Sequence, residues 1–310
     1  MFFNSERKTE QPKQLAAVVV TYNRRELLLR CIEKIRNQQN VECDILVVDN
    51  ASSDGTGETV LAMADNRLQY RNTGSNLGGA GGFQFGIRWA VEAGYNLVWM
   101  MDDDTLPEPD TLAELLAADA RLEGNYGFLS SAVLWTDGHE CKMNRQKIKK
   151  SFYEHVEFLK DALIQIEQAT FVSMLLPAET IRKVGLPIKE FFIWGDDIEF
   201  TRRITVRNGL PSYLVGRSQV VHAMRENNGS NLATDSADRI DRYRYAYRNE
   251  NNIYRQEGLK GFCYYTARCV RALAQIWGNA KDSRLRRSWV LISCYIGGLF
   301  FNPLIEYVNK

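Results

Sequence analysis

The sequence lacks the features that mark several classes of protein. Its six cysteines form no Cys-x-x-Cys pair and show no zinc-binding spacing. No apolar run reaches the ~18 residues of a membrane span, and the stretch Met1–Lys13 is polar and charged, unlike a signal peptide. These absences argue against a zinc protein, a membrane-spanning protein and a secreted one. We therefore expect a cytoplasmic protein in which Cys31 and Cys43 are reduced core residues.

Net charge is also low, but it is unevenly distributed. The 310 residues sum to +1, whereas the segment from Arg239 to Arg287 holds twelve Lys and Arg against four Asp and Glu. A basic C-terminal block indicates an anionic partner, either phosphate-bearing lipid or nucleic acid. The hydrophobic content of 45% fits a globular chain of one large or two small domains.

An acidic triplet directly follows an apolar stretch. The run Tyr95–Met101 predicts a buried strand, and Asp102, Asp103 and Asp104 come next. Adjacent carboxylates that lose hydration repel one another. Alternate residues of an extended chain point the same way, so Asp102 and Asp104 can face one cation while Asp103 points elsewhere. Hard oxygen ligands favour Mg²⁺ or Mn²⁺, and the alternative is a solvated acidic loop.

The remaining pattern predicts a doubly wound α/β fold. Two strand–helix steps begin the chain, and both strands end in polar residues, as at the ligand-binding edge of such sheets. A capping box from Asn23 to Glu26 predicts where the first helix begins. We expect strands at Leu15–Thr21, Cys43–Val48, Tyr126–Leu134, Gln168–Leu176 and Tyr213–Val221, helices at Phe83–Glu92, Thr111–Leu122 and Ala178–Val184, and a mobile loop at Asp137–Lys150.

A glycine-rich run precedes one of these helices. The segment Asn72–Phe83 holds five glycines, which let the backbone approach a ligand, and the helix that follows offers its amide end to phosphate. The run lacks the Gly-Lys-Ser/Thr of a P-loop and is not a dinucleotide fingerprint. A flexible turn is the alternative interpretation.

A second acidic pair, Asp196 and Asp197, follows the aromatic run Phe191–Trp194, which we expect to be a strand that leads into a helix. One carboxylate can act as a general base while Trp194 packs on a flat substrate face, although helix capping would explain one of the two. His222 ends a predicted strand, where it is well placed as a metal ligand.

Together these motifs resemble family 2 glycosyltransferases of the GT-A fold. The resemblance rests on Val18–Arg24, Val47–Thr56, the glycine run, Asp102–Asp104, Trp194–Asp197 and His222, and it is greatest to bacterial galactofuranosyl- and rhamnosyltransferases. It implies a Rossmann-like, doubly wound mixed α/β sheet in a catalytic domain of residues 14–235. An N-terminal tail of residues 1–13 would precede this domain, and a C-terminal helical region of residues 236–310 would follow it.

The resemblance also implies roles for individual residues. Asp102, Asp104 and His222 would bind Mn²⁺ or Mg²⁺, and Asp197 would be the catalytic base with Asp196 as its partner. Binding of the nucleotide-sugar would fall to Thr21, Asn23, Asp49, Asn76, Gly78, Gly79, Gly81, Gly82, Asp103 and Trp194.

The implied function is a metal-dependent, inverting transfer of a hexose. Galactofuranose from UDP-galactofuranose is the first expectation, and rhamnose from dTDP-rhamnose is the alternative. The acceptor would be a hydroxyl of a glycan or lipid-linked acceptor in cell-surface polysaccharide synthesis. A non-catalytic sugar-nucleotide or glycan-binding module is the alternative of another class, and the sequence does not indicate an oligomeric state.

The basic C-terminal third carries two further patterns. Tyr243–Tyr254 interleaves aromatic and basic residues, which can also bind single strands, but a sugar-nucleotide core leads us to expect no nucleic acid. Arg284–Arg287 precede the apolar run Trp289–Phe301, which is too short to span a bilayer. This run suits a helix in peripheral contact with the inner face of the cell membrane, and equally a buried packing or dimerisation helix.

Overall fold

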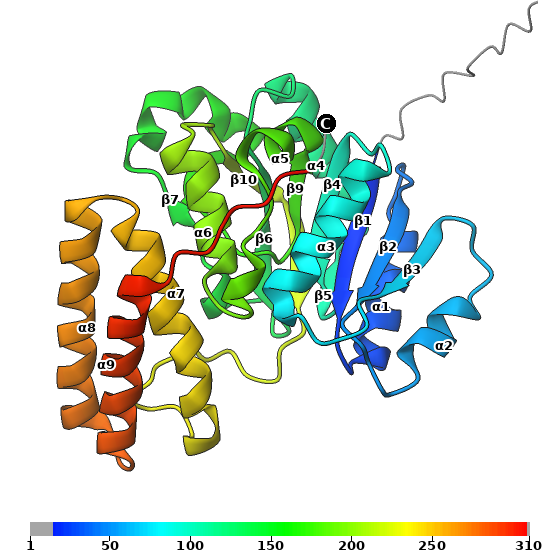
Figure 1. Cartoon of the computed structure of the whole chain (residues 1–310). Coiled ribbons are helices and arrows are strands. Elements are labelled where there is room, and N and C mark those ends of the chain that lie inside the picture. Colours follow the sequence, from blue (N-terminus) through cyan, green and yellow to red (C-terminus); the bar gives the residue numbers. More distant parts are fainter. Residues whose placement is uncertain (1–14, 309–310) are drawn as a thin grey trace, which may run out of the picture.

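The computed structural model describes residues 15–308, and its centre is a single ten-stranded sheet (Figure 1). The strand order is β3-β2-β1-β4-β9-β6-β10-β8-β7, and β5 pairs with β10 beside this path. The strands are β1 (Leu15–Thr21), β2 (Asp44–Asp49), β3 (Leu68–Asn72), β4 (Leu97–Asp102), β5 (Thr105–Pro107), β6 (Leu129–Trp135), β7 (Lys147–Ile148), β8 (Leu163–Gln168), β9 (Met174–Pro177) and β10 (Tyr213–His222).

The helices cover both faces of this sheet and extend the chain beyond it. They are α1 (Arg25–Arg36), α2 (Thr56–Leu61), α3 (Gly78–Glu92), α4 (Thr111–Leu122), α5 (Ala178–Val184), α6 (Asp196–Arg202), α7 (Tyr243–Arg255), α8 (Leu259–Asn279) and α9 (Arg284–Phe300). Short 3₁₀ segments span Lys142–Asn144, Lys150–Asp161, Lys189–Phe191 and Ala237–Arg242, and a π-helical turn spans Arg203–Arg207.

β1 illustrates why the central strands are apolar along their whole length. Val18 belongs to the core cluster that contains Ile87 of α3, whereas its neighbour Val19 belongs to the cluster that contains Ile32 of α1. Successive side chains of a strand point to opposite faces, so both faces of β1 are buried beneath helices. β3, β2, β1 and β4 run parallel, and β9 pairs antiparallel with β4 and β6. The expected doubly wound mixed sheet is therefore confirmed.

The C-terminal helices form a bundle with an apolar core of its own (Figure 1). Ile240, Tyr265, Ile276 and Leu291 are buried in this core. The segment after α9 then returns to the sheet domain, where the Glu306 carbonyl accepts from the Leu186 amide at 2.8 Å. The expected C-terminal helical extension is present, and none of the helices within residues 15–308 is long and apolar enough to cross a membrane.

Several local predictions were wrong, and backbone conformation explains each of them. α1 begins at Arg25 without a side-chain cap, because Asn23 adopts a positive φ of 53° and its Oδ1 accepts from the Ser53 amide at 2.7 Å instead. The expected strand Gln168–Leu176 is divided into β8 and β9 by a bend around Ser173, whose φ is 62°. The run Phe191–Trp194 is not a strand, since φ is 63° at Phe192 and 64° at Trp194.

Candidate active site

The acidic triplet and His222 meet through a short strand pairing. β4 ends at Asp102, and β5 then pairs antiparallel with β10, which places His222 opposite Thr105. The Ala223 amide also donates to the Asp104 carbonyl at 2.9 Å. As a result, one side-chain ligand atom from each of Asp102, Asp104 and His222 lies within 4.8 Å of the others. The structure thus brings together the three residues that the sequence predicted as metal ligands.

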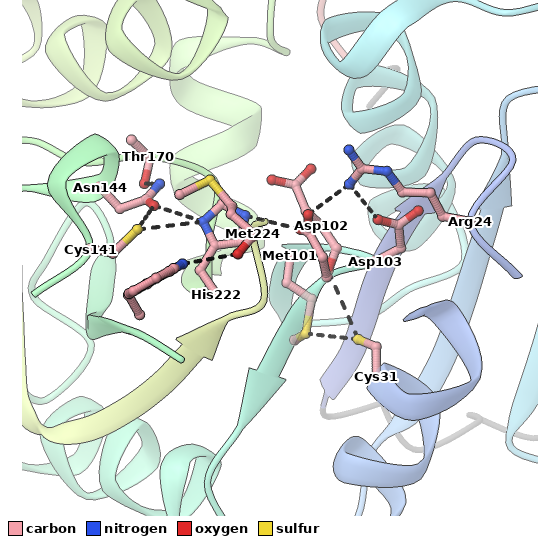
Figure 2. Close-up of polar contacts among 12 residues, drawn as sticks. Arg24, Cys31, Met101, Asp102, Asp103, Cys141, Asn144, Thr170, His222 and Met224 are labelled. Carbon is pink, nitrogen blue, oxygen red and sulfur yellow. Dashed lines mark hydrogen bonds and ion pairs between the residues drawn. The ribbon is translucent and has the colours of Figure 1, made fainter. Parts of the chain in front are cut away.

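Arg24 completes the charge balance of this cluster (Figure 2). Its Nη1 lies 2.7 Å from Asp104 Oδ2 and 3.2 Å from Asp103 Oδ1. The Thr21 hydroxyl donates to the other Asp103 oxygen at 2.7 Å. Asp103 therefore points away from the predicted metal site, as expected from strand alternation. It is held between Thr21 and Arg24 with 3% of its surface exposed.

His222 is oriented from its far side by Asn144. The Asn144 amide donates to the Thr170 hydroxyl at 2.8 Å, so its carbonyl oxygen accepts from His222 Nδ1, also at 2.8 Å (Figure 2). His222 Nε2 then faces Asp104 Oδ1 at 3.0 Å. Burial alone would lower the pKa of His222, but hydrogen bonds with Asp104 and Cys141 and the nearby carboxylate charges raise it to about 10.

The electrostatics of the triplet fit a divalent cation. Burial, reinforced by the charge of Asp104, raises the pKa of Asp102 to about 7. Burial likewise raises the pKa of Asp103 to about 6, although Arg24 opposes that shift. Crowded carboxylates of this kind are costly to ionise unless a positive charge lies between them. Carboxylate oxygens suit Mn²⁺ and Mg²⁺, and ligation by the imidazole requires that Nε2 carry no proton.

The second acidic pair stands at the start of α6. Gly195 precedes it with a φ of 87°, a conformation that glycine adopts at little cost. The irregular backbone of residues 191–194 is fixed from α7, since the Asn249 amide donates to the carbonyls of Phe191, Ile193 and Trp194 at 2.9, 3.2 and 2.7 Å.

Asp196 and Asp197 have different environments. Asp197 is half-buried, and burial raises its pKa to about 6 although the Ile198 amide donates to its Oδ1 at 2.7 Å. Burial raises the pKa of Asp196 further, and the charges of Asp197 and Asp102 add to the shift. Burial therefore opposes ionisation of Asp196 more strongly than that of Asp197. The charge of Asp102 acts on Asp196, and both residues line the same cavity.

Both clusters open into a single cavity of about 910 Å³. Asp102, Asp104 and His222 line it at one part, and Asp197 and Trp194 at another. Trp194 is half-buried against Tyr243 of α7, with ring centroids 5.1 Å apart. Part of the remaining wall comes from α7 and α8, so the C-terminal bundle helps to enclose the site.

Comparison with known proteins identifies the family. Residues 16–158 match the family described as Glycosyl transferase family 2. The chain is 27% identical over 258 residues to galactofuranosyltransferase GlfT1 of Mycolicibacterium smegmatis, an alignment that covers 79% of this chain and 84% of that protein. The chain therefore carries a family 2 glycosyltransferase domain over residues 16–158. It resembles bacterial galactofuranosyltransferases, as its motifs predicted.

Further relatives align over smaller shares of the glycosyltransferase. GlfT1 of Mycobacterium tuberculosis is 29% identical over 208 residues, which cover 63% of this chain and 65% of that protein. The undecaprenyl-phosphate mannosyltransferase of Micrococcus luteus is 36% identical over 109 residues, or 34% of this chain and 44% of that protein. The crystal structure of GalNAc-T7 with UDP, GalNAc and Mn²⁺ matches with a TM-score of 0.65 at 13% identity, covering 94% of this chain and 56% of that chain. This last similarity bears out the GT-A fold.

The residues expected to hold the nucleoside differ in their exposure to solvent. Asn23 is exposed at the end of β1, and Thr21 lies buried beneath it. Asp49 is fully buried, with Oδ1 accepting from the Ser52 amide and Oδ2 from the Tyr70 hydroxyl at 2.6 Å. In this conformation Asp49 therefore braces the loop after β2 and does not face the cavity. Its predicted contact with the donor would require that loop to move.

The second half of the glycine run is helical, so the helix predicted to begin at Phe83 begins five residues earlier. α3 begins at Gly78, and the exposed Asn76 accepts from the Gly78 amide at 2.8 Å. A Cβ on Gly78 would lie 2.1 Å from the Phe192 carbonyl oxygen, and one on Gly82 would lie 2.5 Å from Val20. Gly78 and Gly82 therefore allow close packing, and Gly81 is buried as well. Of the four predicted glycines, Gly79 is the one that lines the cavity.

Sequence reasoning missed two residues of the site. Arg24 ends the Thr-Tyr-Asn-Arg motif, so its position beside the strand end was a usable signal. Asn144 lies in the segment expected to be a mobile loop, where it is buried with 6% exposure. No sequence pattern marks it, because its role depends on a contact with a strand 78 residues away.

Proposed function

We propose that this glycosyltransferase is a metal-dependent, inverting hexosyltransferase that uses UDP-galactofuranose. The observation that carries the proposal is the meeting of Asp102, Asp104 and His222 opposite Asp197 in one cavity. The names of the GlfT1 relatives favour galactofuranose as the sugar. A cation held by Asp102, Asp104 and His222 would offset the charge that develops on a diphosphate leaving group.

The arrangement of the carboxylates supports a single displacement. Asp197 in its ionised form takes the proton from an acceptor hydroxyl as that oxygen attacks the anomeric carbon. The bond from that carbon to the diphosphate breaks, and the nucleoside diphosphate leaves. Asp196 keeps its own proton and so can donate to a sugar oxygen without competing as a base. One displacement inverts the configuration at the anomeric carbon.

The acceptor side of the cavity is formed by the C-terminal bundle. Tyr243, Tyr247 and Tyr264 line it there, and aromatic rings pack well on the apolar faces of sugars. We infer that the acceptor is a glycan or lipid-linked glycan used in cell-surface polysaccharide synthesis. We also place the enzyme at the inner face of the cell membrane, where such an acceptor is presented.

A donor panel tests this function. UDP-galactofuranose, dTDP-rhamnose, UDP-galactose and UDP-glucose are each incubated with enzyme, Mn²⁺ and a bacterial glycolipid extract, and nucleotide release is measured. We expect release from UDP-galactofuranose that is abolished by chelator and by Asp197→Asn. Preference for dTDP-rhamnose would instead identify a rhamnosyltransferase. Chelator-resistant release with every donor would contradict the metal-dependent mechanism.

A further inference from the structure

We propose that the outward face of the α8–α9 hairpin docks on an anionic lipid bilayer. The proposal concerns a surface outside the reaction centre and stands whichever donor the enzyme uses. The two helices lie side by side at the end of the molecule farthest from α2 (Figure 1). Both helices carry large apolar side chains that remain exposed to solvent.

α9 presents a continuous apolar stripe to solvent. Leu285, Trp289, Ile292, Ile296 and Phe300 follow one another at spacings of four, three, four and four residues, which places them on one helix face. All five are exposed, with Trp289 at 70% and Phe300 at 80%. The opposite face of α9 packs in the bundle core through Val290 and Leu291.

α8 adds a parallel stripe to the same surface. Leu259, Val270 and Trp277 share a helix face and are 78%, 62% and 55% exposed. α8 and α9 contact each other through Tyr295, whose hydroxyl lies 2.8 Å from that of Thr266. On each helix the exposed stripe adjoins the side that makes this contact, so the two stripes form one face. An exposed apolar area of this extent marks a site of association.

Basic residues lie at the turn between the two helices, beside the tryptophans. Lys281, Arg284 and Arg286 are exposed there, and Arg286 pairs with Asp241 at 2.8 Å. Within residues 259–300 the acidic complement is a single residue, Asp282, which pairs with Arg287 at 2.5 Å. Arg287 itself is 2% exposed, so it supports the turn and is not available to headgroups as the sequence had suggested.

This charge distribution favours a bilayer over a second copy of the chain. Two copies joined through this face would bring their basic turns together, and the acidic residues at the turn, Asp241 and Asp282, already pair with Arg286 and Arg287. Anionic headgroups instead neutralise Lys281 and Arg284, while tryptophans occupy the boundary between headgroups and acyl chains. Docking also has a consequence for access, because the other side of α8 lines the active-site cavity through Tyr264, Arg268 and Arg271. The acceptor end of the cavity would then lie next to the membrane.

Vesicle co-sedimentation of the full chain tests the proposal. The vesicles contain phosphatidylcholine with phosphatidylglycerol, or phosphatidylcholine alone. We expect binding to the anionic vesicles that weakens about tenfold or more in the Trp289→Ser/Ile296→Ser variant. Lys281→Ser/Arg284→Ser should weaken it about fivefold for each lost charge. Leu61→Ser is the matched control, because Leu61 is 70% exposed on α2 and should leave binding unchanged.

Each outcome has a distinct meaning. Thermal melting of every variant shows that loss of sedimentation does not reflect unfolding, and nucleotide release without vesicles tests the proposed function separately. Wild-type protein that remains in the supernatant with anionic vesicles overturns the proposal. Equal binding to neutral vesicles also overturns it, because the basic turn would then contribute nothing. A dimer in light scattering that Trp289→Ser dissociates, without vesicle binding, would identify the face as a self-interface instead.

Discussion

His222 Nδ1 lies 2.8 Å from the side-chain carbonyl of Asn144, and this hydrogen bond decides which imidazole nitrogen faces Asp104. The Asn144 amide is committed to Thr170, so its oxygen is the acceptor and Nδ1 carries the proton. Nε2 is thereby the atom directed at the carboxylates. A partner of this kind fixes both the tautomer and the ring orientation of a metal-ligating histidine.

Asn144→Ala should therefore weaken Mn²⁺ binding roughly 10- to 100-fold while the protein stays folded. The measurement is nucleotide release as a function of Mn²⁺ concentration. Asn228→Ala is the control, since the Asn228 amide donates to Glu226 rather than into the site. An unchanged Mn²⁺ dependence in Asn144→Ala would show that His222 is not a ligand or needs no support.

Asp104→Ala should abolish cation-dependent UDP binding. Asp104 uses one oxygen for His222 and the other for Arg24, so its loss removes a ligand and leaves Arg24 paired with Asp103 alone. UDP affinity is measured by calorimetry with Mn²⁺ and with chelator. Asp110→Ala, which removes an exposed carboxylate six residues further on, should behave as wild type. Equal UDP affinity with and without chelator in wild type would contradict the metal site.

Asp197→Asn should lower turnover about 10²- to 10⁴-fold, the usual contribution of a general base, and leave UDP affinity unchanged. Asp196→Asn should cost less and act mainly on the acceptor KM, because burial opposes ionisation of Asp196 more strongly than that of Asp197. Transfer rates and calorimetric UDP binding are compared for both variants. Near wild-type turnover in Asp197→Asn would make Asp197 a helix-capping residue and Asp196 the next candidate for the base.

The pH dependence of kcat/KM should report the ionisation of Asp197. Its pKa is raised by burial to about 6, and the base acts when it is ionised. Activity should therefore be full above this value and fall as the pH is lowered through about 6, approaching tenfold for each further unit. The profile is measured at saturating Mn²⁺. If the residual activity of Asp197→Asn still falls as the pH is lowered through about 6, the ionising group is not Asp197.

Gly82→Ala should destabilise the fold by about 1–3 kcal/mol, because the added Cβ would lie 2.5 Å from Val20 and 2.9 Å from Asn50. Gly79→Ala is the matched control in the same helix. A Cβ there meets no atom within 4 Å, so it should stabilise by up to about 1 kcal/mol through helix propensity. Urea unfolding measures both. Equal effects of the two substitutions would contradict the packing role of the glycine run.

Several elements could be predicted because their information is local. The apolar run Leu15–Thr21 forms β1 with the expected bounds, and Ala178–Val184 forms α5, closed by Gly185 at a φ of 81°. A strand period, a helix period and a glycine with positive φ each act within a few residues. The same holds for the acidic triplet, since a strand that ends in consecutive carboxylates predicts that alternate ones face the same way. The placement of His222 at the end of β10 was likewise predicted correctly.

The partners of these residues depended on the tertiary structure. That His222 lies beside Asp104 follows from the pairing of β5 with β10, which no local pattern specifies. Asn144 reaches His222 from a segment without periodicity, and the glycines of α3 are required by the closeness of Val20 and Phe192. The irregular backbone before Asp196 is stabilised by Asn249, more than fifty residues later. The amino-acid sequence alone thus predicted which side chains would carry the chemistry, because composition and short-range spacing encode it. Only the packing of distant elements decided which groups orient and bury them, because those contacts depend on strand order and helix docking.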